Sequence, residues 1–313
     1  MITFVLRKVD WSALGALLAQ VHAGWALAGW AATSLLIVGL AFRWQIFLHQ
    51  QKIDLPFSTV CWLTWAGQFF NSFLPGATGG DVVKIYQVCR LMPDRKAAAA
   101  ATVFVDRLAA LVALLVLAGI AFAIDPVPLR ILSVPSLSIM TVAWIFLLLL
   151  AVAVFAFFLL SAMRSSLWGG RVIRTLAAAK NNLSLDRSGL AALSLAFALH
   201  LLNSLIAYLF AKSLGLSITY LQTAIMVPVV LFFILLPITI NGHGLRELLL
   251  IAYFTQMGIT LGGFAGGVRE IAVAFSLLLV ANDLVWCIPG GIWYMLRFKA
   301  PGGALPQAPG TSP

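Results

Sequence analysis

The chain has 313 residues, of which 62% are hydrophobic and 10% are charged, and its mean hydropathy is +1.02. Soluble proteins carry about 25% charged residues, so the composition excludes a soluble globular protein and indicates a polytopic membrane protein. The net charge is +10, but the basic residues are spread between apolar stretches, which favours loops facing anionic lipid over a nucleic-acid-binding patch.

The first predicted element, residues 1–23, carries Leu14 and Leu17 at helical spacing with polar residues around them. This pattern indicates an amphipathic helix at the membrane interface, or a truncated first helix, rather than a span. Residues 24–299 are expected to form the transmembrane domain. The tail, residues 300–313, is rich in Pro and Gly and is predicted to be disordered.

Eight apolar stretches follow the first element, and each is compatible with the roughly 20 residues that a crossing needs, although the seventh is short. We expect an all-α polytopic membrane protein with about seven transmembrane segments and one or two broken or re-entrant helices, an order compatible with a pseudo-symmetric repeat. Arg43 and Trp44 close the first stretch as a cation and an aromatic of the interfacial kind. The stretches are residues 24–42, 57–74, 97–124, 136–163, 190–210, 220–240, 245–259 and 268–296.

The second stretch leads into a first interruption, NSFLPGATGGDVVK, which runs from Asn71 to Lys84. Pro75 removes a backbone donor, and the three glycines carry the largest entropy cost of helix formation, so the chain cannot continue as one helix. Non-helical backbone at membrane depth persists only where it is buried in protein or lines a wet cavity. The interruption is therefore a candidate site.

A second interruption, LLPITINGHGLRE, runs from Leu235 to Glu247 and repeats the order of the first. An apolar run ends in Leu-Pro, closely spaced glycines follow, and then comes a basic residue with an acid beside it. Paired interruptions in the two halves of a membrane protein are the best sequence indication of a transport site.

Charge placement indicates the orientation in the membrane. Residues 164–187 hold five basic residues and one acid, which predicts a cytoplasmic loop. When crossings are counted from this loop toward the N-terminus, a full crossing by residues 57–74 places Arg43 and Lys52 outside, against the positive-inside bias. A re-entrant hairpin at residues 57–84 keeps both residues inside. Two basic residues in one loop are weak topology evidence, so both interpretations stay open. Counting forward, Arg246 is expected at the cytoplasmic end of its helix, and the C-terminus in the cytoplasm.

Several motifs carry a family resemblance; in order they are Asp10-Trp11, Arg43-Trp44, the first interruption, Asp106-Arg107, the second interruption and a last helix ending IPGGIWY. The chain resembles the flippase-like transmembrane family, the membrane domain of the lysylphosphatidylglycerol synthases (multiple peptide resistance factors) and their stand-alone relatives. The resemblance implies lipid handling in the cytoplasmic (inner) membrane. Members usually carry a further helix before the Asp-Trp and often Arg where Lys84 stands. No soluble acyltransferase-like domain follows, so the lysine-transferring activity of the two-part synthases is not implied.

Each interruption offers what an anionic phosphate needs in a low-dielectric place, namely backbone N–H groups at a helix N-terminus and a basic side chain. The acids are expected to orient the cations or contact an aminoacyl amine, and the asparagines to bond the broken backbone or the headgroup. The alternatives are an interfacial Arg246–Glu247 pair that caps a helix and simple snorkelling of Lys84. The candidate headgroup residues are Asn71, Gly79, Gly80, Asp81, Lys84, Asn241, Gly242, Gly244, Arg246 and Glu247.

Further polar residues lie inside the apolar stretches. Asp283 is near the middle of the last stretch, where a charge costs at least about 2.5 kcal/mol on insertion scales. It must face protein or water, with Arg107 or Arg246 as its partner, and two interpretations are equally weighted: proton or ion coupling, and a structural pair with Arg107. His200 and Asn203 share a helix face and are expected to hold helices together.

The leading hypothesis is a lipid translocase with a membrane lipid as its substrate, more plausibly a transporter than an enzyme. One alternative is a membrane-embedded transferase on a lipid-linked donor, which needs a general base and a metal-binding carboxylate cluster, whereas the ten acids are mostly isolated. The other is a non-catalytic partner of a separate lipid synthase. Homo-oligomerisation is compatible with the sequence, and no cofactor or metal is expected, since the cysteines lack ligand spacing.

Overall fold

The computed structural model describes residues 10–73, 79–124, 187–235, 244–259, 261 and 266–298. Over these residues the chain forms nine α-helices and one 3-10 helix, and no strand, which confirms the all-α prediction. The predicted stretch at 136–163 and the basic loop that follows it lie outside this part. The elements are α2 (Trp11–Ala19), α3 (Ala23–Gln50), α4 (Phe57–Phe73), α5 (Gly79–Leu91), η1 (Pro93–Arg95), α6 (Lys96–Ile124), α10 (Arg187–Ser213), α11 (Tyr220–Leu235), α12 (Leu245–Gln256) and α13 (Val268–Phe298).

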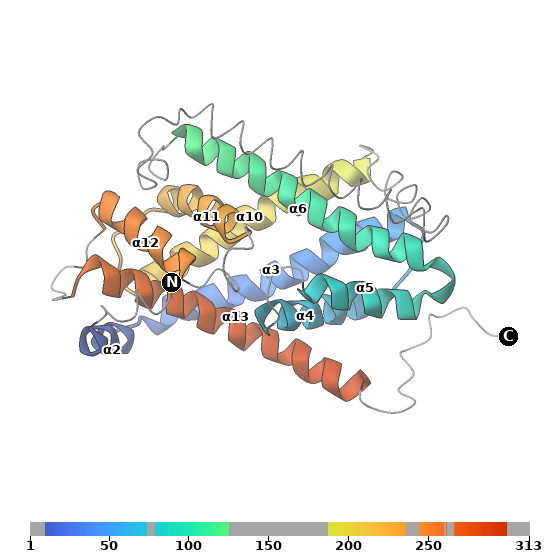
Figure 1. Ribbon diagram of the computed structural model, residues 1–313, viewed down its shortest axis with the longest axis horizontal. Helices are drawn as coiled ribbons and strands as arrows, with labels where there is room; N and C mark the ends of the chain where they lie inside the picture. The colour runs from blue at the N-terminus through green and yellow to red at the C-terminus, as the bar shows by residue number, and fades with distance from the viewer. Residues whose placement is uncertain are drawn as a thin grey trace.

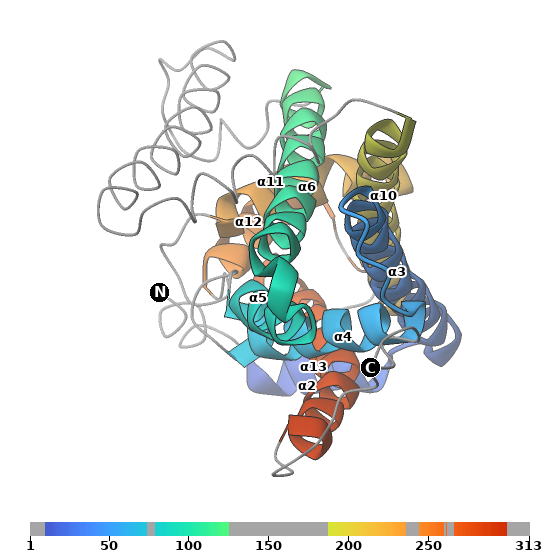
Figure 2. The ribbon, with the colours of Figure 1, turned by 90° about the vertical axis from the view of Figure 1, so that its right-hand side faces the viewer.

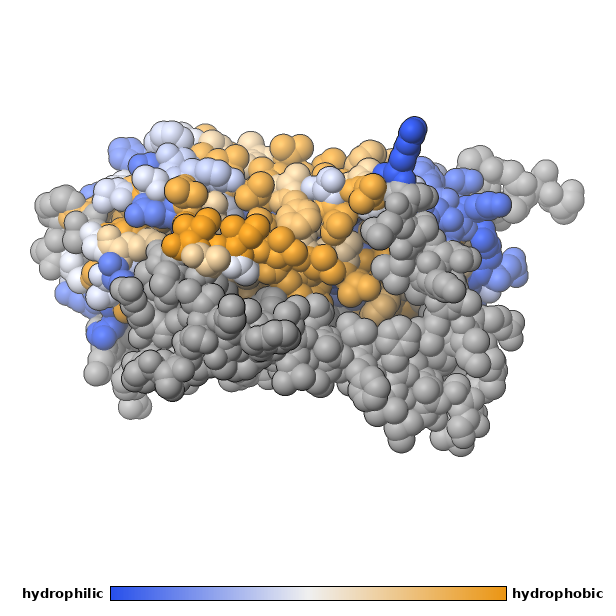
Figure 3. All heavy atoms as spheres, turned by 90° about the horizontal axis from the view of Figure 1, so that it is seen from above, coloured by the Kyte–Doolittle hydropathy of each residue, from blue (hydrophilic) through white to orange (hydrophobic). Residues whose placement is uncertain are grey.

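Four helices of the described chain, α3, α6, α10 and α13, are long and apolar enough to cross a membrane. They run along the length of the molecule in Figure 1, and in Figure 2 α3 and α10 lie side by side. The face shown in Figure 3 is apolar across its middle and hydrophilic at both ends. This distribution matches a bilayer core between two aqueous layers, so the chain is a multi-pass membrane protein.

The segment from α4 to α5, which we call the first hairpin, doubles back instead of crossing. Its helices have 17 and 13 residues, or about 26 and 20 Å, against a bilayer core of about 30 Å. Arg95 Nη1 donates to the Lys52 carbonyl at 2.7 Å, so the start of α4 and the end of α5 meet at one end of the bundle. This path is the one that the re-entrant prediction requires.

The segment from α11 to α12, the second hairpin, also doubles back, at the other end. A Cβ added at Gly215, before the hairpin, would lie 3.4 Å from Leu261 Cδ1, after it. The His22 N–H donates to the Ser213 carbonyl at 2.8 Å, which places this end beside the start of α3. Residues 220–240 and 245–259 were predicted as two crossings, but α11 has 16 residues and α12 has 12, or about 24 and 18 Å, so each described helix is shorter than a bilayer core of about 30 Å. In Figure 1 the two hairpins occupy opposite halves.

Inside the first hairpin, the two helices approach closely through glycine. A Cβ on Gly80 would overlap the carbonyl oxygen of Gly67. The Gly80 N–H donates to Asn71 Oδ1 at 2.7 Å, so Asn71 caps the helix that follows the break. Small residues at such contacts let helix backbones pack at short distance.

A row of four tryptophans, the tryptophan stack, joins the first hairpin to α13. Ring centroids are 5.8 Å apart between Trp293 and Trp62, 5.6 Å between Trp62 and Trp65, and 6.1 Å between Trp65 and Trp286. Trp65 Nε1 also donates to the Trp286 carbonyl at 2.8 Å. Gly290 lies against the Trp65 backbone with no room for a side chain. The hairpin is thereby fixed against one long helix.

Helix α2 packs on the other half of α13. Its Leu14 and Leu17 are buried, and the Asp10 N–H donates to Glu270 Oε1 at 3.2 Å. Asp10 caps α2, and hydrogen bonds to its carboxylate from the Ser12 hydroxyl and then from the Ala13 and Ser12 N–H groups lower its pKa. The hydrogen bond from the Asp10 N–H to Glu270 joins α2 to the end of the bundle where the second hairpin opens.

Candidate functional site

Two groups of charged side chains lie inside the described bundle, each beside one hairpin. One group, the ion cluster, lies among α3, α5 and α6. The other lines a pocket among α3, α10, α11, α12 and α13. The ion cluster consists of Arg43, Asp81, Lys84, Asp106 and Arg107.

The centre of the ion cluster is a buried pair between α3 and α6. Arg43 Nε donates to Asp106 Oδ1 at 2.8 Å and Arg43 Nη2 to Asp106 Oδ2 at 3.3 Å. The neighbouring Trp44 is fully buried and donates from Nε1 to Thr102 Oγ1 at 3.0 Å. The prediction that Arg43 and Trp44 end a helix at the membrane interface is wrong, because α3 continues to Gln50 and an acid on α6 compensates the buried guanidinium.

Lys84 lies beside this pair. Its Nζ is 4.1 Å from the centroid of the Trp44 ring, a cation–π contact, and the residue is 7% exposed. Snorkelling to a surface is therefore excluded for Lys84. The first acid of α5, Asp81, pairs with Arg107 Nε at 2.5 Å, and the Arg107 side chain is 47% exposed. Because Arg107 pairs with Asp81, the prediction that it is the partner of Asp283 is wrong.

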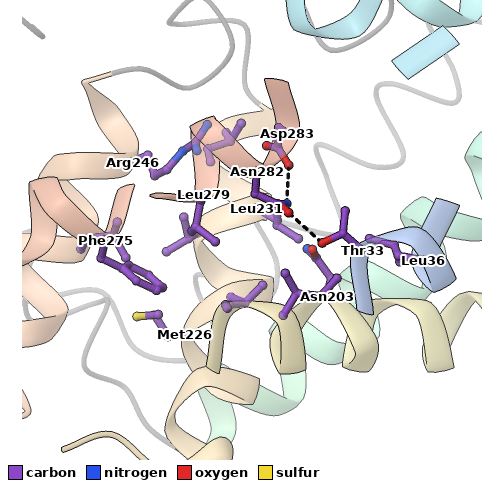
Figure 4. A pocket seen from close by; sticks show the side chains of 16 residues that line it. Thr33, Leu36, Asn203, Met226, Leu231, Arg246, Phe275, Leu279, Asn282 and Asp283 are labelled. Atoms are coloured by element: carbon purple, nitrogen blue, oxygen red, sulfur yellow. Dashed lines mark hydrogen bonds between the residues drawn. The ribbon is translucent and has the colours of Figure 1, made fainter. Parts of the chain in front are cut away.

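The pocket has a volume of about 280 Å³ and a mostly apolar lining (Figure 4). Thr33, Asn203 and Asp283, which line it, lie near the middle of α3, α10 and α13, so the pocket is at mid-depth of the bundle. Five polar side chains face it from four helices. They are Thr33, Asn203, Arg246, Asn282 and Asp283.

A chain of hydrogen bonds holds the polar wall of the pocket. Thr33 Oγ1 lies 3.1 Å from Asn282 Oδ1 and 2.9 Å from the Gly29 carbonyl, and it can donate to either. Asn282 Nδ2 donates to Asp283 Oδ1 at 3.4 Å (Figure 4). Asn282 is buried, whereas Asp283 is exposed and also lines the pocket. The carboxylate of Asp283 is thus accessible to a ligand although it lies deep in the bundle.

Arg246 reaches the pocket from the first turn of α12. It is buried, and its guanidinium is near enough to Asp283 to interact electrostatically with the carboxylate. The prediction that Arg246 lies at the cytoplasmic end of its helix is wrong, because α12 starts inside the bundle. An interfacial Arg246–Glu247 pair is excluded for the same reason.

Glu247 caps the start of α12. Its Oε2 accepts from the Gly244 N–H and its Oε1 from the Ser276 hydroxyl, both at 2.5 Å. Gly244 has φ +88°, a left-handed conformation that favours glycine. Glu247 therefore caps α12 and ties it to α13, and its predicted role beside the cation stays a prediction.

The structure separates the predicted headgroup residues. Of these, Arg246 lines the pocket, as does Asp283, which was predicted as a coupling residue. Asn71, Gly80, Asp81, Lys84, Gly244 and Glu247 do not line it. Gly79, which begins α5, is also absent from the lining, and Asn241 and Gly242 lie outside the described residues.

Three polar residues of the pocket were not predicted as site residues. Asn282 could have been predicted, because it stands beside Asp283 as a second polar residue in an apolar helix. Asn203 was predicted to hold helices together. Thr33 gave none, because a single threonine is common in apolar helices. In the described part, no three His, Cys, Asp or Glu side chains gather as a metal site.

Comparison with known proteins gives one family. The model of the lysylphosphatidylglycerol synthase TM region matches residues 1–281. A search of curated proteins found no match. The family match covers both hairpins and every pocket residue except Asn282 and Asp283, which lie just beyond its end.

Proposed function

Because the chain belongs to the lysylphosphatidylglycerol synthase TM region family, we propose that it is a lipid translocase that moves an anionic or aminoacylated lipid headgroup across the cytoplasmic membrane. The observation that supports this most is the pocket, which presents a cation, a carboxylate and three hydrogen-bonding side chains at mid-depth among apolar residues. Charged groups at membrane depth are costly and mark substrate or ion pathways.

The pocket chemistry suits a phospholipid headgroup. A guanidinium binds a phosphate bidentately, so Arg246 is assigned to the phosphate. Asp283 is assigned to an amine of the headgroup or to a coupling proton or ion, and Asn203 and Thr33 to ester or hydroxyl oxygens. A volume of about 280 Å³ suits a headgroup whose acyl chains remain in the bilayer.

The order of elements supports alternating access. A long helix, a hairpin and a second long helix form one unit, α3 to α6, and the same order recurs from α10 to α13. The two hairpins open at opposite ends. We therefore assign the units to an inverted pseudo-symmetric repeat, in which transport sites lie near the midplane between the repeats. We assign the end of the bundle that carries Lys52 and Arg95, and with it the end of α13, to the cytoplasm, because basic residues favour that side of a membrane.

Transport in reconstituted vesicles tests the proposal. Vesicles contain an aminoacylated lipid, and an impermeant amine reagent measures how fast inner-leaflet headgroups reach the outer leaflet. Arg246→Ala is expected to reduce the rate to that of protein-free vesicles while the protein still elutes as folded material. The control is Arg297→Ala, since Arg297 is an exposed arginine at the end of α13. A wild-type rate with Arg246→Ala would remove the pocket from the mechanism.

The inverted arrangement has its own test. Single cysteines at Lys52 and Thr219, both exposed and at opposite ends, are introduced into a variant without Cys61, Cys89 and Cys287. An impermeant thiol reagent applied to sealed vesicles of one orientation is expected to label only one of the two. Labelling of both positions from the same side contradicts the assignment.

A further inference from the structure

The ion cluster beside the first hairpin has one positive charge in excess. Its arginines each take one acid, Arg43 with Asp106 and Arg107 with Asp81. Lys84 interacts electrostatically with all four, yet no carboxylate of the described residues forms an ion pair with it. The ammonium group instead lies 4.1 Å from the centroid of the Trp44 ring. A cation–π contact offsets only part of the cost of burying an ammonium group.

Two neighbouring polar side chains are buried and unpartnered. Gln87 is 0% exposed, and neither Gln87 Nε2 nor Oε1 has a hydrogen-bond partner in the part of the chain that the structure describes. The same holds for the hydroxyl of Thr64, which is 3% exposed. Buried polar groups are normally hydrogen-bonded, so each of these needs an explanation.

Helix geometry brings these groups together with Lys84. Gln87 follows Lys84 by three residues, so the two side chains share one face of α5. A Cβ added at Gly67 of α4 would lie 2.9 Å from Lys84 Cγ, which makes Gly67 and Lys84 direct neighbours. Because α4 and α5 run antiparallel, Thr64, one turn before Gly67, lies at the level of Gln87, one turn after Lys84.

We propose that the first hairpin contains a second anion site, in which Lys84, Gln87 and Thr64 bind a phosphate group. The ammonium group, the amide Nε2–H and the hydroxyl supply the donors, and the negative charge balances the ion cluster. A buried water molecule would satisfy the amide but would leave the excess charge in place. Arg107, which interacts electrostatically with Lys84, has a side chain that is 47% exposed.

This site is separate from the pocket at Arg246 and stands whether or not that pocket translocates lipid. The phosphate is either that of a lipid headgroup or inorganic phosphate, since both present the same anionic oxygens. The lipid source would give the protein two phosphate sites, one beside each hairpin. If the ligand is inorganic phosphate, the bound anion would stabilise the packing of the first hairpin against the rest of the bundle.

Anion-dependent stability of the full chain in neutral detergent micelles tests the proposal. In one arm, inorganic phosphate is titrated at constant ionic strength, with sodium gluconate as the balancing salt. In the other arm, phosphatidylglycerol is titrated into the micelles without free phosphate, with phosphatidylcholine as its control. The wild-type thermal midpoint is expected to rise by several degrees and saturate in at least one arm, because a ligand of the folded state stabilises it.

Matched variants give the specificity. Lys84→Met is expected to lose the response, whereas Lys212→Met, which removes a lysine from the ring of Tyr208, is expected to keep it. If Lys84→Met does not fold, Gln87→Leu replaces it. That variant should unfold at a higher temperature than wild type without anion, since an unpartnered buried amide is gone, and should respond less to anion.

The outcomes separate the sources and the proposals. A response to inorganic phosphate alone assigns the free anion, and a response to phosphatidylglycerol alone assigns the lipid. No wild-type response in either arm, or equal responses in wild type and the variant, overturns the site. Loss of transport in Arg246→Ala concerns the pocket and leaves this result unchanged.

Discussion

The two hairpins begin from similar interruptions and end in different surroundings. The first is packed: Gly80 touches Gly67, Asn71 caps α5, and the cation that follows the break lies in a dense cluster of charges. The second borders an open pocket, where Arg246 faces a carboxylate across space for a ligand. Its capping group is Glu247, which also accepts from α13.

The difference lies in the neighbours and not in the interruptions themselves. Around the first hairpin, α3 and α6 supply Arg43, Asp106 and a buried tryptophan that lie beside the cation. Around the second hairpin, α13 supplies Asp283 and Asn282 but leaves a volume of about 280 Å³. A break with glycines and a basic residue therefore sets the depth at which a cation lies, whereas the long helices decide whether that cation lies in a dense cluster of charges or beside an open pocket.

The largest effect is expected at the glycine contact of the first hairpin. Gly80→Ala places a Cβ against the Gly67 carbonyl, where backbone must move, and should cost at least about 3 kcal/mol of stability. We expect little monodisperse protein by size-exclusion chromatography. The control is Gly119→Ala on α6, which meets nothing within 4 Å and should be neutral or slightly stabilising. Normal yield of Gly80→Ala would show that the first hairpin is not tightly packed.

Removal of Arg43 should come next in size. Arg43→Ala leaves the buried Asp106 without its partner, which typically costs about 3–5 kcal/mol. Denaturation monitored by circular dichroism in micelles measures the loss. The double variant Arg43→Met with Asp106→Leu is expected to recover most of it, because neither member of the pair is left buried without the other. If the double variant is no better than the single one, the pair is not the source of the effect.

A smaller effect is expected at the second hairpin. Glu247→Ala removes the acceptor for Gly244 and Ser276 at the start of α12, which should cost about 1–2 kcal/mol. Glu247→Gln keeps one amide oxygen as an acceptor and should cost less. If Glu247 only caps the helix, both variants retain the wild-type transport rate per folded molecule in the vesicle assay. A selective loss of transport in Glu247→Gln would return Glu247 to the substrate-contacting residues.

The smallest effect is expected at α2, which braces the end of the bundle where the second hairpin opens. The pKa of Asp10 is lowered from its ordinary value of 3.8 by hydrogen bonds to its charged form. The capping contribution is therefore complete above pH 3.8 and disappears as the pH falls through the lowered pKa. Hydrogen exchange of residues 11–19, corrected for intrinsic rates, should show protection at pH 6 that falls at low pH. Asp10→Ala should give the low-pH behaviour at both values.

The helices were predictable because membrane-spanning runs are long and apolar. The runs predicted at 57–74, 97–124 and 268–296 correspond to α4, α6 and α13 within two residues at either end. Whether a run crosses or doubles back was harder, because apolar content does not report direction. The first hairpin was suggested by the basic residues at its ends. The second hairpin lacks such a charge signal and was taken for two crossings.

The helix interruptions near the site could be predicted from the sequence, whereas the ion pairs between helices could not. Arg246 and Asp283 were singled out from sequence, and they share the pocket. The pairing of Arg43 with Asp106, 63 positions away, was not visible, since spacing along the chain does not show which faces of α3 and α6 meet. The burial of Lys84 could not be predicted for the same reason. A basic residue near the end of an apolar stretch is compatible with a place at the membrane interface, so snorkelling was kept as an alternative.

The tryptophan stack gives the protein an internal optical reporter. Trp293 and Trp62 lie nearly parallel, with an interplanar angle of 5°, and Trp65 and Trp286 continue the row. Rings this close couple their electronic transitions and produce a near-ultraviolet circular dichroism band that depends on their mutual orientation. A conformational cycle that tilts α4 away from α13 would therefore change that band in unlabelled protein, whereas motion confined to α11 and α12 would leave it untouched.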